Sequence, residues 1–240
     1  MFNSAQSIMH VFLIDELKDG LVYLDPQESS HAFKVLRLSV GDAVVAIDGL
    51  GTLYRCDVID ASTKKGVLKV VSQELSEQRK PSITIAMAPT KSSDRFEWFV
   101  EKACEIGVDR ITPVICERSE RRKLNLDRTH KLISAACKQS GNPWFPLLSD
   151  PMSFKDFINS VKPGFIAHCH DQSKTPITQL NLSDRKECTV LIGPEGDFSN
   201  AELELALSAG WEPISLGRNR LRTETAALLS LVAITLKSSS

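Results

Sequence analysis

The amino-acid sequence predicts an α/β protein in which a small strand-rich region precedes a larger region built on a parallel sheet. Residues 1–74 contain short runs of alternating polar and apolar residues, the pattern of half-buried strands. From Ile83 onward, short apolar runs alternate with segments of helical periodicity, which is typical of a parallel sheet covered by helices on both faces. The polar, proline-punctuated segment 75–82 is expected to link two domains, 1–74 and 83–240.

The N-terminal region is expected to form a small β-barrel. Strands are predicted at 44–47, 52–59 and 67–71. One short helix, capped by Ser29 or Ser30, would precede them. Lys34 and Arg37 would share the outer face of this helix. They form either a solvated flank, which the residues alone favour, or a nucleic-acid contact.

The C-terminal region is expected to alternate between strands and helices. Strands are predicted at 83–87, 111–116, 165–169, 189–192 and 214–216, with a weaker one at 145–148. The helix after the first of these strands would begin at the cap pair Asp94 and Glu97 and end at Gly107. A second helix is expected over 126–140, with Ile133 on its inner side.

The stretch after the strand at 189–192 is the most informative part of the chain. Gly193-Pro-Glu-Gly196 predicts a turn whose glycines let backbone approach a bound molecule. Ser199 and Glu202 have the spacing of a capping box, so a helix should start at once, and Gly210 should end it. Taken alone, the turn fits a purely structural role equally well.

A second strand-to-helix loop repeats this layout at 213–226. Gly217 opens the loop, and Thr223 or Thr225 is expected to cap a helix that runs through Ala226–Leu236. Between the glycine and the helix lie charged residues: Arg218, Arg220, Arg222 and Glu224. Arg222 and Glu224 could form an ion pair that fixes the loop. Two adjacent loops of this kind predict a ligand crevice at the carboxyl ends of the strands.

Several classes of function lack their signatures. Neither GxGxxG nor GxxxxGK[ST] occurs, so nucleotide sites of the common kinds are not indicated. His168-Cys169-His170 lies at a strand end without further ligands at zinc-site spacing, so no metal is expected. The six cysteines form no CxxC pair, and neither a signal peptide nor a membrane span is expected, which favours the cytoplasm.

Charge gives a weaker indication. The net charge of −1 shows no general bias toward nucleic acid, although the segment 118–138 is locally basic. This segment is either a solvated loop and helix face or a patch that contacts RNA phosphates. The residues alone favour neither alternative.

The paired C-terminal loops closely resemble those of the RsmE-type RNA methyltransferases of the SPOUT superfamily. The resemblance is carried by Gly193–Gly196 with Ser199 and Glu202, and by Leu216-Gly217 with Leu221-Arg-Thr-Glu-Thr-Ala226. Other matching segments are His31–Arg37, Glu101-Lys102, Glu105–Gly107, Ile111–Pro113 and Ala135–Cys137, so that the match covers nearly the whole chain.

The resemblance implies a PUA-like barrel followed by a SPOUT methyltransferase domain whose parallel sheet is threaded in a trefoil knot. It also implies a homodimer that uses S-adenosylmethionine (SAM), without a metal, to methylate N3 of a uridine in 16S rRNA of the small ribosomal subunit. Two rival functions stay open: a SPOUT methyltransferase acting on another RNA atom, and a non-catalytic RNA-binding assembly factor.

The resemblance also assigns site residues. Arg222 would stabilise the uridine anion, and Glu224 would orient it or assist proton removal. The predicted cofactor contacts are His168, Leu191, Ile192, Gly193, Pro194, Glu195, Gly196, Leu216, Gly217, Leu221, Thr225 and Ala226. The predicted RNA contacts are Lys34, Arg37, Arg118, Arg121, Arg122 and Lys123. The chain departs from the family at Asp197, where glycine is usual, at Lys138, where an acid is usual, and near Asn142, where an arginine is usual.

Overall fold

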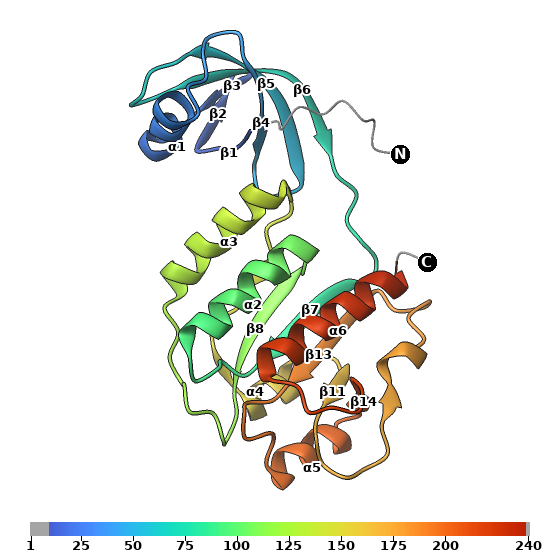
Figure 1. Ribbon diagram of the computed structural model, residues 1–240. Helices are drawn as coiled ribbons and strands as arrows, with labels where there is room; N and C mark the ends of the chain where they lie inside the picture. Colours follow the sequence, from blue (N-terminus) through green and yellow to red (C-terminus); the bar gives the residue numbers. More distant parts are fainter. Residues whose placement is uncertain (1–9, 239–240) are drawn as a thin grey trace. The chain divides into compact units, whose positions relative to one another are not determined.

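The computed structural model describes residues 10–238, and its internal contacts divide the chain into two units (Figure 1). One unit runs as far as Gln78 and includes Cys137–Phe145. The other contains Arg79–Ala136 and the chain from Pro146 onward. The predicted domain limits at 74 and 83 stay predictions. The grouping of Cys137–Phe145 with the first unit is a tertiary feature that no linear pattern indicates.

The first unit is built on one strongly curved antiparallel sheet. Its strands are β1 (Val11–Leu13), β2 (Glu16–Lys18), β3 (Leu21–Tyr23), β4 (Ala43–Ile47), β5 (Thr52–Asp60) and β6 (Val67–Leu75), in the order β1-β4-β5-β6-β3-β2. Only the β1–β4 pair is parallel. Phe12, Val22 and Leu68 are fully buried in its core. The three predicted strands are confirmed, whereas β1–β3 are too short for their alternation to be recognised.

The helical segment of this unit begins earlier than predicted. α1 (Pro26–Ser30) is capped by Asp25, whose Oδ1 accepts a hydrogen bond from the amide of Glu28 at 2.7 Å, and it continues as a π-helical turn, η1 (His31–Val35). The predicted cap at Ser29 or Ser30 is therefore wrong. Both serines lie within the helix, and the buried Ser29 hydroxyl instead accepts from the amide of Gly66 at 2.8 Å.

The segment Cys137–Phe145 packs inside the first unit. The Trp144 indole donates to the carbonyl of Ser76 at 3.2 Å, and the amide of Gly51 donates to the carbonyl of Pro143 at 2.9 Å. Lys138 forms an ion pair with the buried Glu28. Lys138, which departs from the family pattern, therefore neutralises a carboxylate that would be costly to bury alone.

The second unit is built on a parallel sheet of eight strands. They are β7 (Ser82–Met87), β8 (Arg110–Ile115), β9 (Leu147–Leu148), β10 (Met152–Ser153), β11 (Phe165–Ala167), β12 (Thr175–Pro176), β13 (Glu187–Ile192) and β14 (Glu212–Ser215). Their order is β10-β8-β7-β13-β11-β14-β12, with β9 also paired to β8. The parallel sheet and all six of its predicted strands are confirmed. The two-residue β10 and β12 carry no periodic signal.

Helices cover both faces of this sheet, as predicted (Figure 1). They are α2 (Ser93–Ile106), α4 (Phe154–Ser160), α5 (Asn200–Ser208) and α6 (Thr223–Ser238), with a 3-10 turn, η2 (Ile177–Gln179). The predicted helix over 126–140 is confirmed as α3 (Leu126–Ser140), whose last residues, from Cys137, belong to the first unit. α2 packs on α6, which contacts β7 and β13, while α4 and α5 share a core with the opposite face of the central strands. No helix of the described residues has the length and apolar character needed to cross a membrane.

The termini of α2 show one correct and one wrong prediction. Gly107 ends the helix with a left-handed φ of 90°, as expected of a C-terminal glycine. The helix begins after Ser92, so Asp94 lies in its first turn instead of capping it. Glu97 instead forms an ion pair with Arg128 of α3 at 2.7 Å.

The packing of Gly51 against Trp144 generates a prediction about stability. A Cβ at Gly51 would lie 2.2 Å from the Trp144 ring, on a backbone with φ +102°. We expect Gly51→Ala to lower the free energy of unfolding by about 2–4 kcal/mol, because ring overlap adds to backbone strain. Gly20→Ala is the matched control, since Gly20 has φ +75° with nothing within 4 Å. It should cost only about 1 kcal/mol in the same urea titration. Equal losses would contradict the packing argument.

Candidate functional site

A cavity of about 520 Å³ lies at the carboxyl edge of the parallel sheet. Its walls come from the segments that follow β11, β13 and β14, which are neighbours in the sheet order β13-β11-β14. Parallel neighbours end at the same edge, so loops far apart in sequence meet there. The predicted crevice is therefore present, and its volume lies within the range of about 300–1,000 Å³ that is usual for small-molecule sites.

The loop between β13 and α5 is fixed by the predicted capping box. The Ser199 hydroxyl accepts from the amide of Glu202 at 3.3 Å, and the Glu202 carboxylate accepts from the amide of Ser199 at 3.0 Å. The other oxygen of Glu202 accepts from the amide of Glu117 at 2.8 Å, which ties in the loop after β8. Gly210 follows α5 with φ +90°, as predicted for its end.

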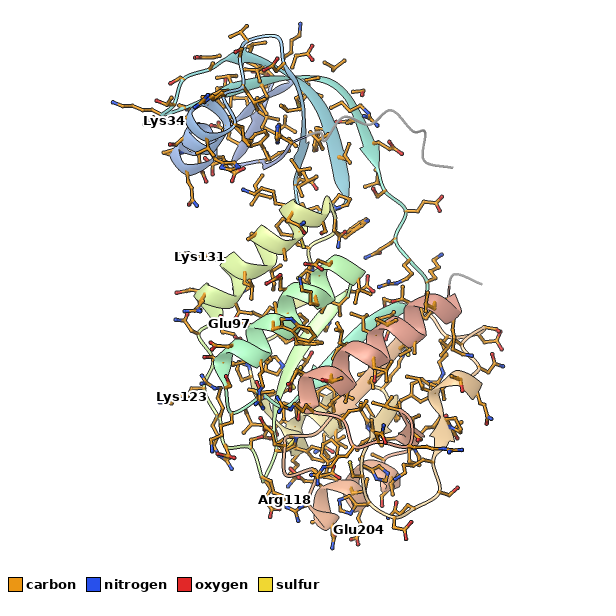
Figure 2. All side chains as sticks on the ribbon, viewed as in Figure 1. Lys34, Glu97, Arg118, Lys123, Lys131 and Glu204 are labelled. Atoms are coloured by element: carbon orange, nitrogen blue, oxygen red, sulfur yellow. The ribbon has the colours of Figure 1, made fainter. Side chains whose placement is uncertain are left out.

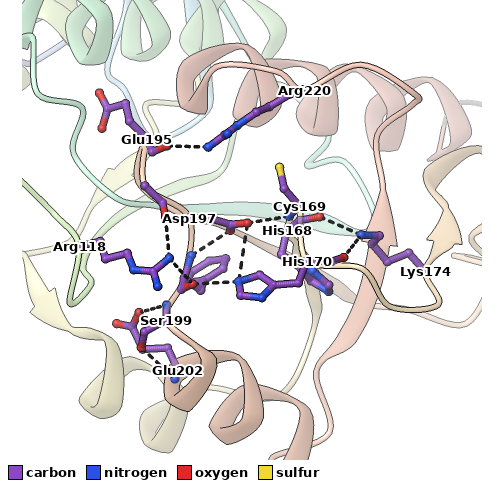
Figure 3. Close-up of polar contacts among 12 residues, drawn as sticks. Arg118, His168, Cys169, His170, Lys174, Glu195, Asp197, Ser199, Glu202 and Arg220 are labelled. Carbon is purple, nitrogen blue, oxygen red and sulfur yellow. Dashed lines mark hydrogen bonds and ion pairs between the residues drawn. The ribbon is translucent and has the colours of Figure 1, made fainter.

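Side chains from other segments donate to the backbone of this same loop. Arg220 donates to the carbonyl of Glu195 at 3.1 Å, and Arg118 donates to the carbonyl of Gly196 at 2.9 Å (Figure 3). The buried hydroxyl of Thr223, the first residue of α6, donates to the carbonyl of Gly193 at 3.1 Å. The two predicted loops are thus joined directly to each other.

Asp197 links the same loop to the segment after β11. Its φ of 62° is left-handed, a conformation that glycine adopts without strain. Its carboxylate accepts from the amide of Cys169 at 2.8 Å and from the amide of Phe198 at 2.9 Å, and the ring of His170 lies 3.8 Å away. Figure 3 shows this link between the two segments. Asp197, which stands where the family usually has glycine, therefore adds a side-chain hydrogen bond between this loop and the segment after β11.

His168 lines the cavity with a buried imidazole ring. Only 8% of the residue is exposed, and neither ring nitrogen has a hydrogen-bond partner among the described residues. Lys174 donates to the carbonyls of His168 and His170 at 3.3 and 2.5 Å, which fixes the turn. A buried polar ring without a partner costs free energy, and a ligand that hydrogen-bonds to it would recover that cost.

The arginine-rich loop differs from its predicted arrangement. Arg222 lines the cavity, and among the described residues its guanidinium has neither an ion pair nor a hydrogen bond. Glu224 is buried and does not line the cavity. The ion pair of Glu224 is formed with Arg95 of α2, at 3.8 Å, and not with Arg222. The predicted Arg222–Glu224 pair is therefore not formed in this structure.

Most predicted cofactor residues meet at the cavity: His168, Ile192, Gly193, Pro194, Glu195, Leu216, Gly217, Leu221 and Ala226. Three do not line it. Leu191 is buried in the core, Gly196 directs its carbonyl to Arg118, and Thr225 is exposed on α6. No linear pattern indicates Cys169 and Lys174 as site residues. They line the cavity because β11 lies beside β13, a pairing that local sequence does not contain.

The predicted RNA contacts fall into two groups, one in each unit. Lys34 and Arg37 are exposed in the first unit, as Figure 2 shows for Lys34. In the second unit, Arg121 donates to the carbonyl of Lys91 and Arg122 to that of Glu117, so these side chains also order the loop after β8. Lys123 is exposed.

Two family models cover most of the chain. A model of the RNA methyltransferase domain matches residues 77–235, and a model of the RNA methyltransferase PUA domain matches residues 24–71. A relative from Aquifex aeolicus, named ribosomal RNA small subunit methyltransferase E, is 30% identical over 94% of this chain and 98% of its own length.

Solved structures extend the likeness to the fold. A probable rRNA-methyltransferase from Porphyromonas gingivalis is 34% identical with a TM-score of 0.89, covering 96% of this chain and 99% of its own. A putative methyltransferase from Legionella pneumophila, solved with the bound cofactor SAM, is 27% identical with a TM-score of 0.83 over 95% of this chain and 98% of its own. The predicted fold class, a PUA-like region followed by an α/β domain of this type, is thereby confirmed.

The buried state of His168 generates a prediction about pH. Burial, with the nearby Lys174 ammonium as the next cause, lowers the pKa of this imidazole from 6.5 to about 4. Between these values the unfolded chain binds a proton that the folded chain does not, so the free energy of unfolding should fall as pH drops through this window. Between pH 7.5 and 4, the wild type should lose on the order of 1–3 kcal/mol more than His168→Leu. Urea unfolding of both proteins at both pH values measures this, and parallel losses would contradict it.

Proposed function

This chain belongs to the RNA methyltransferase family, and we propose that it transfers a methyl group from SAM to N3 of a uridine in 16S rRNA. The observation that carries the proposal is the cavity at the carboxyl edge of the sheet, where a glycine-bracketed loop and Arg222, whose guanidinium has no partner in the described part of the chain, line the same space. The SAM complex of the Legionella pneumophila structure, 27% identical to this chain, supports the choice of cofactor.

The residues around the cavity fit an adenosine-containing ligand. Backbone groups of Gly193–Glu195, Gly217 and Leu221 can recognise the edge of an adenine ring, because backbone carbonyls and the amides of the residues other than Pro194 form hydrogen bonds without a side chain. His168, neutral near pH 7 because its pKa is lowered to about 4, can donate or accept a hydrogen bond at the wall. We propose these residues, with Ile192 and Ala226 as apolar contacts, as the SAM site.

The proposed reaction needs stabilisation of negative charge. Uridine N3 lies between two carbonyl groups and becomes a nucleophile only as its proton leaves for water and charge spreads onto both oxygens. When bound, SAM supplies a methyl group activated by a sulfonium: the N–C bond forms as the C–S bond breaks. We propose that Arg222 places its guanidinium against the developing anion. Glu224, buried behind the loop, is proposed to orient Arg222.

A homodimer and a trefoil knot are further parts of the proposal. In support of a dimer, α6 exposes Leu229 and Leu236, and α2, which packs on α6, exposes Trp98. The knot is proposed from the resemblance to the SPOUT superfamily, and the hydrogen bond from Thr223, at the start of α6, to Gly193 shows only that the two loops are in contact. None of the six cysteines, which all lie within the described residues, forms a disulfide, which is in keeping with a cytoplasmic location.

Arg222→Ala tests the proposed chemistry. This variant should lower the rate of transfer at least a hundredfold, because one group that stabilises the transition state typically contributes about 10²–10³ in rate. Its affinity for SAM should stay within twofold in calorimetry, and Arg222→Lys should recover part of the rate. The measurement is mass spectrometry of nucleosides from small-subunit RNA treated with labelled SAM.

The wild-type result separates the candidate functions. Label in 3-methyluridine supports the proposal, label in another nucleoside or in ribose supports a different target atom, and RNA binding without SAM binding supports a non-catalytic factor. If Arg222→Ala also lost SAM affinity, the role assigned to Arg222 would be wrong.

The first unit is proposed to dock the RNA. Lys34→Ala combined with Arg37→Ala should raise the KM for RNA about tenfold at physiological salt without changing kcat, because exposed cations contribute phosphate contacts and not chemistry. Lys64→Ala combined with Lys69→Ala removes the same charge from exposed positions of the same unit and is the matched control. Equal effects of the two double variants would mean that only net charge matters.

A further inference from the structure

The ion pair between α2 and α6 has no part in the function proposed so far. Glu224 lies in the first turn of α6 with its side chain 8% exposed, and one of its carboxylate oxygens, Oε2, is buried and has no hydrogen-bond partner among residues 10–238. The other oxygen, Oε1, lies 3.8 Å from Nε of Arg95, whose side chain is 40% exposed. Arg95 lies in the first turn of α2 and does not line the cavity.

The position of Arg95 in the first turn does not stabilise α2. The N-terminal turn of a helix has a partial positive charge, so a cation there is unfavourable, whereas the carboxylate of Glu224 in the first turn of α6 is favourable. A buried carboxylate with an unpartnered oxygen is costly unless a cation lies close. Arg95 supplies the cation that the structure places beside Glu224. The pair therefore fixes the first turn of α6 relative to α2.

This turn is continuous with the loop that carries the proposed anion-stabilising group. Arg222 is two residues before Glu224, and its carbonyl accepts from the amide of Ala226 at 2.8 Å, the hydrogen bond that starts α6. A shift of this turn would move the Arg222 backbone with it. Positioning errors of about 1 Å are enough to cost two orders of magnitude in rate.

We propose that Arg95 is a positioning residue for methyl transfer, acting through Glu224 to hold Arg222 at the cavity. The inference rests on the proposed function, since it assigns Arg95 a part in the same reaction. Arg95 is more than a hundred residues away from Glu224 and Arg222 in the sequence. The first turns of α2 and α6 would together fix the position of the Arg222 guanidinium.

The test is a double-mutant cycle on the full-length protein, with Arg95→Ala, Glu224→Gln and both together, followed under single-turnover conditions with labelled SAM. Arg95→Ala should lower the transfer rate at least tenfold and leave the affinity for SAM within twofold, because Arg95 does not line the cavity. Adding Arg95→Ala to Glu224→Gln should lower the rate by less than a further twofold, because Arg95 then has no carboxylate through which to act. Arg95→Lys should recover part of the rate.

Lys102→Ala is the control for loss of a cation from α2, because Lys102 pairs only with Glu101 and Glu105 of its own helix among the described residues. The Lys102→Ala variant should transfer the methyl group at the wild-type rate.

A transfer rate of Arg95→Ala equal to that of Lys102→Ala would overturn the inference. Full additivity of the effects of Arg95→Ala and Glu224→Gln on the rate would also overturn it. A loss of SAM affinity or of folded structure in Arg95→Ala, seen by calorimetry and circular dichroism, would assign Arg95 a structural role and overturn it too. A wild type without transfer would reject the proposed function itself, and a wild type with transfer confines any failure to Arg95.

Discussion

The common carboxyl edge of β13, β11 and β14 is the constraint on which the rest of the site depends. Because the three strands are parallel neighbours, the segments that leave them must start side by side. A loop with glycines, a loop with arginines and a turn with a buried histidine are thereby brought to one cavity. None of the three would form a site alone, since each presents only one wall.

The loops keep their shape because their backbone groups are satisfied by side chains from other segments. Arg118, Arg220 and Thr223 donate to three carbonyls of the loop after β13, and Asp197 accepts a hydrogen bond from an amide of the segment after β11. Irregular backbone that is bonded in this way is expensive to rearrange. The His168 ring and the Arg222 guanidinium, which have no partner within residues 10–238, lie at the cavity that these fixed loops form, and we propose that both meet a ligand there.

Several basic residues of the segment 118–138, for which the sequence suggests RNA contacts, form hydrogen bonds or ion pairs within the protein. Arg118 and Arg121 donate to loop carbonyls, and Lys138 neutralises the buried Glu28. Such contacts do not remove the charge, so Arg118 and Arg121 can order a loop and still attract phosphate. We propose that each unit contributes cations to RNA binding. Lys34 in the first unit and Lys123 in the second are exposed side chains that could do so.

The sequence by itself determined the α/β class, six of the eight strands of the parallel sheet, the capping box at Ser199 and Glu202, and the two loops that line the cavity. These features depend on local periodicity and on chemistry within a few residues, which a linear pattern contains. The tertiary structure alone decided that Glu224 pairs with Arg95, that Lys174 and Cys169 reach the cavity, and that Trp144 packs on Gly51. Each of these contacts joins residues far apart in the chain, and side-chain geometry across such separations is set by how the sheet is ordered, which no local pattern records.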